Sequence, residues 1–539
     1  MTTTVPRGRK TRRVEPRRPL ANAITQLLID HNELQQMFTA FENTRSVNNK
    51  RFLVRRICAT VVVHAQVKEE IFYPAVESVL PQATPEHTTM KALVAHIQSL
   101  EPVAEHVDAP IQVLAQEIND SLFSFSELAF QEHETAKYLT DILEREGFAI
   151  QRNVAGLPTG WVASWTNGTG GPVIALGSDI DGIPKANQKP GIPWREPLVA
   201  GAPGHGEGHN SGQAVNIVAA LAVRDLMKRH NIAGTLLLWP GVAEELVAGK
   251  AFMVRDGVFK DVDAVLFTHV GSNLETAWGQ PSGTGLVSVE YTFRGESAHS
   301  AQSPWRGRSA LDAVELMNMG WNMRREHLRP EQRSHYVISD GGDQPNVVPS
   351  VASVWYFFRE QGFKEIQNSF DIGNEISEGA AKMTGTTVTR RIIGTAAPRH
   401  FNRPIAEAAY ANIQAVGLPK WTPEEQAFAK VVQKNAKAEK QEGLAVELKK
   451  LEPPVEEPKS GGSDDIGDVS WTVPTITIRY PSNIPDLPGH NWTDAIAMAT
   501  PIGPKLAQAS ITPGKMTRPM IGTIVKPSVG LTPQATAEL

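Results

Sequence analysis

The stretch from Gly204 to Gly212 combines residue types that bind metal ions. It reads Gly-His-Gly-Glu-Gly-His-Asn-Ser-Gly, so that His205, Glu207 and His209 alternate with glycine. Glycine lets the backbone turn tightly enough for neighbouring side chains to converge. A glutamate and a histidine separated by one residue can both face one cation, which predicts a metal site. The same pattern also suits a polar surface loop, and the motif alone leaves both interpretations open.

Further residues of the metal-ligand type stand at the ends of apolar runs. These runs, with an amphipathic helix at 213–230, indicate alternating strands and helices and therefore a mostly parallel sheet. Ligands of such sheets bind at the carboxyl ends of the strands. The runs and the residues that follow them are 171–176 with Asp179 and Asp181, 235–240 with Glu244 and Glu245, and 262–268 with His269. We therefore predict an α/β catalytic domain with its active site at this edge.

Composition narrows the class of protein. The chain has 539 residues, of which 41% are hydrophobic and 21% charged, and this is the balance of a globular protein with more than one domain. A net charge of −5 argues against a nucleic-acid binder, and no apolar run is long enough to span a membrane. The single cysteine, Cys58, excludes an internal disulfide framework and favours a reducing, cytoplasmic location.

The pattern also predicts how the chain divides into domains. Residues near the N-terminus are rich in arginine without an apolar segment, which is typical of a basic disordered arm. From about 283 the alternation changes to half-buried strands around a helix, which predicts an inserted α+β domain. The expected parts are a basic arm (1–20), an all-α helical module (21–105), a catalytic domain (109–282 and 400–510), a lid and dimerisation domain (283–399) and a flexible tail (511–539).

The helical module places His31, His64 and His87 near its apolar faces. A bundle that holds metal and three ordinary, partly buried histidines are both compatible with this spacing. The region resembles the hemerythrin-like, cation-binding bundles at Asp30-His31-Asn32-Glu33-Leu34, and at His64 with Glu69-Glu70-Ile71-Phe72-Tyr73-Pro74. It departs from that family at Lys68, where a carboxylate is usual, and it lacks the fourth helix. We therefore expect a partial module without a di-iron site.

Several motifs in the remaining sequence are shared, in this order, with one family of enzymes. They are Gly204 to Gly212, Ala243-Glu244-Glu245, Ser297-Ala298-His299-Ser300, Pro345-Asn346-Val347-Val348-Pro349, Gly462-Ser463-Asp464-Asp465 and Gly489-His490. Residues 109–510 thereby resemble the metal-dependent aminoacylase and carboxypeptidase type of amidohydrolase, in the B-type branch of the aminobenzoyl-glutamate hydrolases. The resemblance implies a catalytic domain that binds two metal ions and an inserted lid that dimerises.

The resemblance also implies roles for individual residues. Glu244 resembles the general base that takes a proton from water at the metal, and His299 resembles the lid histidine that stabilises the oxyanion, often in the partner's site. Asn346 and Arg359 are expected to bind the substrate amide and carboxylate. Asp179 and Asp181 are expected only to orient ligands. The implied metal ligands are Glu207, His209, Glu245, His269 and His490.

At the position of Glu207 this branch usually has cysteine. A carboxylate can join two cations and is a harder ligand than a thiolate, so we expect Glu207 to bridge two ions and to favour manganese or magnesium. The alternative is that Glu207 points to solvent, and that His209, Glu245 and His269 hold a single ion.

The expected function is hydrolysis of an amide bond in an N-acyl amino acid or aminobenzoyl-glutamate-like substrate, with two divalent ions, Mn or Zn. The expected assembly is a homodimer or a complex with a related A-type subunit, without nucleic acid or membrane. The alternative function is a metal- or iron-sensing binding protein with a degenerate hydrolase half. The presence of Glu244 and His299 favours the hydrolase.

Overall fold

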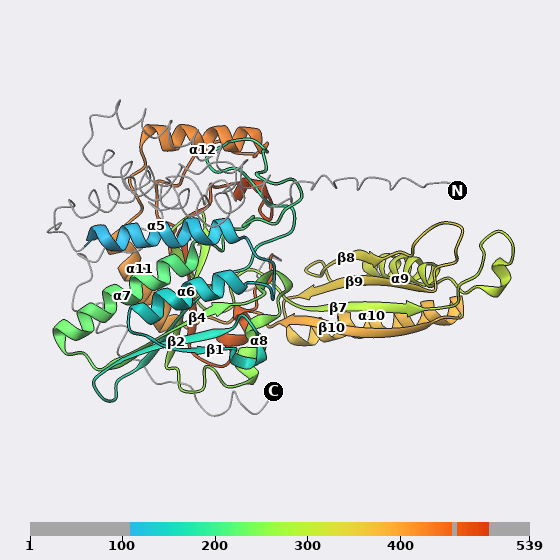
Figure 1. Cartoon of the computed structure of the whole chain (residues 1–539), viewed down its shortest axis with the longest axis horizontal. Coiled ribbons are helices and arrows are strands. Elements are labelled where there is room, and N and C mark those ends of the chain that lie inside the picture. The colour runs from blue at the N-terminus through green and yellow to red at the C-terminus, as the bar shows by residue number, and fades with distance from the viewer. Residues whose placement is uncertain (1–107, 455–460, 495–539) are drawn as a thin grey trace, which may run out of the picture. The chain divides into compact units, whose positions relative to one another are not determined.

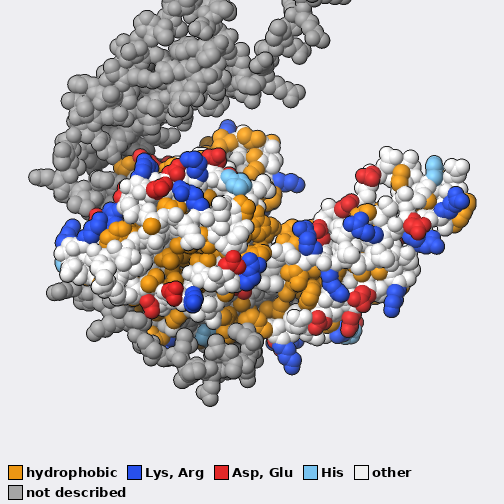
Figure 2. Space-filling model, turned by 60° about the horizontal axis from the view of Figure 1, so that its bottom comes forward, with side chains coloured by type: hydrophobic (Ala, Val, Ile, Leu, Met, Phe, Trp, Pro, Cys, Tyr) orange, Lys and Arg blue, Asp and Glu red, His pale blue; other side chains and the backbone are white. Residues whose placement is uncertain are grey.

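The computed structural model describes residues 108–454 and 461–494. The expected arm (1–20), helical module (21–105) and tail (511–539) lie outside these residues. None of the helices in the described ranges is both long and apolar enough to cross a bilayer. On the face drawn in Figure 2, basic and acidic side chains of the described residues are interspersed rather than gathered by sign.

A seven-stranded sheet carries the strand ends that the sequence singles out (Figure 1). Its order is β1-β2-β4-β3-β5-β11-β6, and β4, β3, β5 and β11 are parallel to one another. The strands are β1 (Ala149–Arg152), β2 (Trp161–Asn167), β3 (Val173–Asp179), β4 (Gly234–Gly241), β5 (Ala264–Gly271), β6 (Glu275–Thr276) and β11 (Thr475–Pro481). The expectation of a mostly parallel sheet is wrong at its two sides, where β1, β2 and β6 pair antiparallel. The sheet is therefore mixed, with a parallel centre.

Helices cover this sheet and connect its strands. The helix α7 packs against β2, β3, β4 and β5, and α5 lies beside α7 (Figure 1). Asn231 ends α7 in the left-handed conformation, after three basic residues that suit the negative end of the helix dipole. The helices are α5 (Asp108–Phe125), α6 (His133–Arg145), α7 (Gly212–His230), α8 (Gly249–Arg255), α11 (Arg403–Val416), α12 (Pro423–Asn435) and α13 (Ile466–Ser470), with 3₁₀ turns η2 (Val154–Gly156) and η3 (Glu244–Leu246).

Residues 285–396 form a second, four-stranded antiparallel sheet with the order β10-β7-β9-β8. Two helices, α9 and α10, pack against each other and on this sheet. The elements are β7 (Gly285–Arg294), η4 (Pro304–Arg306), α9 (Ala310–Arg324), η5 (Arg325–His327), β8 (Arg333–Asp340), β9 (Val351–Glu360), α10 (Phe363–Thr384) and β10 (Thr387–Ala396). We call residues 285–396 the lid.

The core of the larger sheet is centred on Trp239, which is fully buried. Its ring packs edge-on to Phe259 at 5.0 Å and stacks on Phe267 at 5.6 Å between centroids. The indole also lies directly over Gly177 on the neighbouring strand, where a Cβ atom would come within 2.2 Å of the ring. Gly177 therefore leaves the space that the indole occupies, two residues before Asp179.

This close approach predicts the effect of one added methyl group. Gly177→Ala should lower the free energy of unfolding by about 1–3 kcal/mol, because the core must shift to admit it. Gly379→Ala is the matched control, since a Cβ at this position in α10 meets no atom within 4 Å and removes the entropic cost of glycine in a helix. Denaturant unfolding of both variants measures the difference, and equal stability of Gly177→Ala and the parent would contradict the packing argument.

Candidate metal centre and active site

The loop from Gly204 to Gly212 is attached to helix α5 on one side. The Nε2 atom of His205 lies 2.9 Å from the carbonyl oxygen of Leu122, and the Asn210 side-chain amide donates to the Oδ1 of Asn119 at 3.0 Å. Burial lowers the pKa of His205 to about 4, so this ring stays neutral. Of the two histidines in the motif, His205 therefore holds the loop in place and only His209 remains for a metal.

On its other side the loop is attached to the chain that follows β11. The Asn483 side chain donates to the carbonyl of Glu207 at 3.2 Å, and the amide of Asn491 donates to the carbonyl of Gly206 at 3.1 Å. These contacts bring His490 to the loop, and its Nε2 lies 3.1 Å from Glu207 Oε2. The loop is thus fixed between segments far apart in the sequence, which orients Glu207 and His209.

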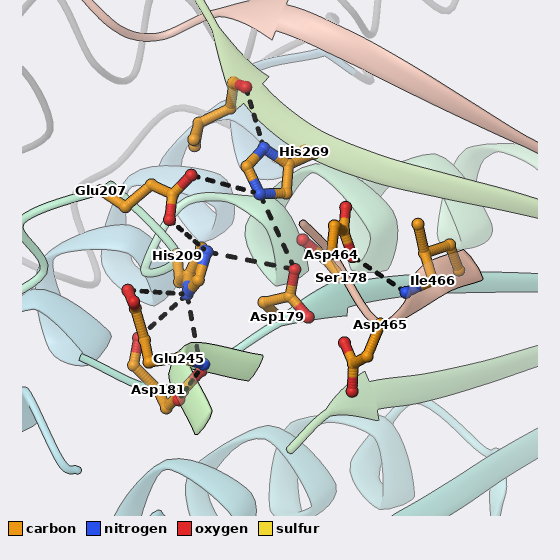
Figure 3. A network of polar contacts seen from close by, with 12 residues as sticks. Ser178, Asp179, Asp181, Glu207, His209, Glu245, His269, Asp464, Asp465 and Ile466 are labelled. Carbon is orange, nitrogen blue, oxygen red and sulfur yellow. Dashed lines mark hydrogen bonds and ion pairs between the residues drawn. The ribbon is translucent and has the colours of Figure 1, made fainter. Parts of the chain in front are cut away.

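Two imidazoles face each other across the centre (Figure 3). The Nδ1 atoms of His209 and His269 lie 3.1 and 3.0 Å from the carbonyls of Asp181 and Val270. If His209 donates from Nδ1, its neutral ring presents the Nε2 lone pair to a metal. The Nδ1 of His269 also lies 3.1 Å from a guanidinium nitrogen of Arg479. The two Nε2 atoms lie 4.0 and 3.9 Å from Asp179 Oδ2, and each lies 3.6 Å from an oxygen of Glu207.

A strained turn after β4 presents the adjacent carboxylates Glu244 and Glu245. Ala243 and Val247, on either side of this turn, both have φ of 54°, a conformation that is costly for a β-branched residue. Glu245 reaches His209 Nδ1 at 3.9 Å and His490 Nδ1 at 3.8 Å. Glu244 is 5% exposed and lies with Glu207, Glu245 and His209 in one group of potential ligands.

The donor atoms fit divalent cations. Asp179 Oδ2 and His209 Nε2 are buried and have no hydrogen-bond partner among the described residues, although each is a strong polar atom. Ligand atoms bound to one ion at about 2.1 Å lie roughly 3.4 Å apart, close to the separations of 3.6–4.0 Å found here. Imidazole and carboxylate are ligands that zinc and manganese accept.

The electrostatics of the centre lead to the same conclusion. Burial, followed by the charge on Glu207, raises the pKa of Glu245 to about 8, and burial raises the pKa of Asp179 to about 7. Burial opposes protonation of His209, but Asp181, Asp179 and other carboxylates still raise its pKa. These groups retain protons because negative charge is in excess, and bound cations would supply the missing positive charge.

The two aspartates after β3 differ in their roles. Asp181 contacts a candidate ligand, because its Oδ2 accepts from the amide of Glu245 at 3.0 Å. Asp179 was expected only to orient ligands, but its Oδ2 lies with His209 and His269 in a group of potential ligand atoms. The reason is that β3 ends deeper in the centre than the motif suggested, and Asp179 is completely buried.

His299 and Asn346 lie in the lid. Their loops are joined by a bridge between His299 and Val347, and by a hydrogen bond from the amide of Ser300 to the carbonyl of Asn346. Both side chains are exposed. Arg359 lies on β9, is half-buried, and its Nε has no hydrogen-bond partner among the described residues. The structure therefore does not bring these three residues into the group of potential metal ligands.

Comparison with known proteins extends these observations. Residues 175–492 match the peptidase family M20/M25/M40. The chain belongs to this family. It is 34% identical over 401 residues to the B subunit of p-aminobenzoyl-glutamate hydrolase from Escherichia coli (strain K12), covering 70% of this chain and 82% of the relative.

Two further relatives match this chain over shorter ranges. Xaa-Arg dipeptidase of Mus musculus is 30% identical, with 53% of this chain and 64% of the relative covered. The A subunit of p-aminobenzoyl-glutamate hydrolase from Escherichia coli (strain K12) is 27% identical, with 44% and 56% covered. As a member of this family, the chain is a hydrolytic enzyme that cleaves amide bonds.

Sequence reasoning missed Glu132, which supports the turn of this M20/M25/M40 site. Its carboxylate accepts from the amide of Ala243 at 2.9 Å and from the hydroxyl of Thr159 at 2.8 Å. Burial, and then the charge of Asp181, raises the pKa of Glu132 to about 7. No motif signals this residue, because it stands just before helix α6 and reaches Ala243 only in the folded chain.

Glu132 predicts a pH dependence of stability. Its folded pKa of about 7 lies above the usual 4.5, so the stability linked to its protonated form is present below pH 4.5 and is lost as the pH rises through about 7. In the parent, ionisation of Glu132 should lower the free energy of unfolding by an amount on the order of 3 kcal/mol between pH 4.5 and 8. Glu132→Gln cannot ionise and should not show this decrease. Urea unfolding of metal-free protein measures this, with the exposed Glu134→Gln as control. Parallel pH profiles for parent and Glu132→Gln would contradict it.

Proposed function

We propose that this enzyme hydrolyses the amide bond of an N-acyl amino acid or an aminobenzoyl-glutamate-like substrate, with two divalent ions, manganese or zinc. The observation that carries this proposal is the buried Glu244, which adjoins a group of imidazole and carboxylate atoms suited to metal ions. A sensing protein would need metal ligands but not a further carboxylate that serves as a general base. The relative that matches over 401 residues acts, by its name, on p-aminobenzoyl-glutamate.

The metal ligands of this proposal are Glu207, His209, Glu245, His269 and His490, joined by Asp179. Glu207 suits a bridging position, because its Oε1 lies 3.6 Å from His269 Nε2 while its Oε2 lies 3.1 Å from His490 Nε2. His209, His269 and Asp179 form one group of potential ligand atoms, and Glu245 lies 3.8 Å from the Nδ1 of His490. When bound, the ions polarise the substrate carbonyl and lower the pKa of water.

Glu244 is the general base of the proposed mechanism. It accepts a proton from the attacking water and delivers it to the nitrogen of the leaving amine as the amide bond breaks. Burial, and then the charges of Asp179 and Asp464, raise the pKa of Glu244 in the metal-free chain. Its backbone is fixed by the turn that Glu132 supports, so the carboxylate does not need to be ordered when substrate binds.

The lid supplies the remaining groups in this proposal. Thr284, just before β7, contacts Gly462 near Asp464, whereas His299 follows the opposite end of β7. A strand of 10 residues extends about 33 Å. His299 would therefore stabilise the oxyanion in the site of a second chain, with Asn346 beside it, while Arg359 binds a substrate carboxylate. This arrangement requires a dimer, either of two copies or with a related A-type subunit.

The proposed domains are a catalytic domain formed by 109–282 and 400–510 and a lid and dimerisation domain formed by 283–399. The two sheets of the described residues support this division, because β7 to β10 form one sheet while the strands before residue 283 and after residue 400 form the other. The cytoplasmic location and the partial hemerythrin-like module at 21–105 stay predictions from the sequence.

Replacing Glu244 tests the proposed mechanism. Glu244→Gln keeps the size of the side chain but cannot accept the proton, so turnover of an N-acyl amino acid should fall by about 10²-fold or more. Metal content should stay near that of the parent, because Glu244 is not a proposed ligand. Steady-state kinetics and elemental analysis measure both quantities, with the exposed Glu375→Gln as control. Turnover close to that of the parent would remove Glu244 from the mechanism.

Replacing Glu207 tests the two-metal arrangement. Glu207→Ala removes both bridging oxygens, so each chain should lose at least one of two bound ions together with its activity. Metal ions per chain are counted after dialysis against a fixed free concentration of Mn²⁺ or Zn²⁺. Two ions bound as tightly as in the parent would show that Glu207 is not a bridge.

A further inference from the structure

Lys250, near the start of α8, is a fully buried lysine beside the metal centre. A buried ammonium group is costly unless carboxylates and hydrogen bonds compensate its lost hydration. None of the sequence motifs includes this residue, and no step of the proposed mechanism uses it. Its burial so close to the ligand group therefore needs an explanation.

Three carboxylates surround the ammonium group, and the most distant of them is Asp464, whose Oδ1 lies 3.8 Å from Lys250 Nζ. Lys250 Nζ lies 2.5 Å from Asp179 Oδ1, pairs closely with Asp465 Oδ1, and lies 4.9 Å from the centroid of the Phe267 ring. The backbone amide of Lys250 also donates to Asp465 Oδ2 at 3.0 Å. Both oxygens of Asp465 therefore contact Lys250, which makes Asp465 a counterion of the ammonium group.

The contact with Lys250 divides the two oxygens of Asp179. Oδ1 faces the ammonium group, and Gly241 allows its position, since a Cβ there would lie 1.9 Å from this oxygen. Oδ2 has no hydrogen-bond partner among the described residues and faces His269 Nε2 at 3.9 Å and His209 Nε2 at 4.0 Å (Figure 3). The pairing thus keeps one oxygen of Asp179 free on the side of the imidazoles.

We propose that Lys250 is a positioning residue, whose ammonium group holds Asp179 Oδ1 so that Oδ2 completes, with His209 and His269, the ligand set for one divalent ion. This inference rests on the proposed metal-dependent function. The groups that surround a ligand commonly set its orientation, and their loss weakens metal binding.

A purely structural role is the competing explanation, in which Lys250 only neutralises buried negative charge. A double variant, Lys250→Met with Asp465→Asn, distinguishes the two explanations. Lys250→Met keeps the length of the side chain but leaves Asp179 and Asp465 uncompensated, so it should lower stability as well as metal affinity. Combining it with Asp465→Asn removes one negative charge together with the positive one. The pair restores the charge balance without restoring the contact to Asp179.

The experiment is a titration of the metal-free full chain with Co²⁺. Calorimetry measures the affinity, and visible absorption reports the ligands around the ion. We expect the double variant to unfold near the temperature of the parent but to bind one of two ions about tenfold or more weakly, with an altered absorption band. The exposed Lys260→Met is the matched control and should bind both ions as the parent does.

Parent-like affinity and absorption in the double variant would overturn the proposal and leave Lys250 as a charge-balancing residue. The same holds for Lys250→Met if it folds and binds both ions as tightly as the parent. A parent chain that binds no Co²⁺ would instead refute the metal-dependent function itself, which is a separate outcome. If Lys250→Met fails to fold, the double variant alone decides, since its charge balance is kept.

Discussion

Uncompensated negative charge at the carboxyl edge of the parallel strands is the constraint around which this structure is built. Asp179, Glu244 and Asp465 are buried, and Glu245 is nearly so. Carboxylates in such surroundings ionise only where positive charge is supplied. Lys250 supplies positive charge on one side of Asp179. On the other side lie the two imidazoles, and Asp179 Oδ2 and His209 Nε2 have no hydrogen-bond partner among the described residues, which suits a cation site.

The backbone around this charge is held by contacts between distant segments. Helix α5 and the segment after β11 fix the loop of Glu207 and His209, and Glu132 fixes the turn of Glu244 and Glu245. Each of these supports is buried or partly buried and hydrogen-bonded. Ligands on loops and turns are thereby positioned as firmly as ligands on strands, which suits a centre that must bind ions without large rearrangement.

The sequence predicted the parts of the site that obey local rules. Glu245 and His269 follow apolar runs, and the rule for the carboxyl ends of parallel strands places them together. The ligand position proposed for Asp179 was missed because the contact that orients it comes from Lys250, 71 residues away, which also pairs with Asp465, a further 215 residues along the chain. The strand pairs at the sides of the sheet were missed because β1 is short and mostly exposed, so its alternation is weak.

The carboxylate of Glu207 has a consequence for the chemistry that the centre tolerates. A thiolate in this place can be oxidised to sulfenic or sulfonic acid, can form mixed disulfides, and reacts with alkylating reagents. Glu207, His209, Glu245 and His269 contain no sulfur, and the only cysteine of the chain, Cys58, lies outside the matched family region. None of these candidate ligands can form a disulfide or a sulfenic acid, so thiol chemistry has no target among them.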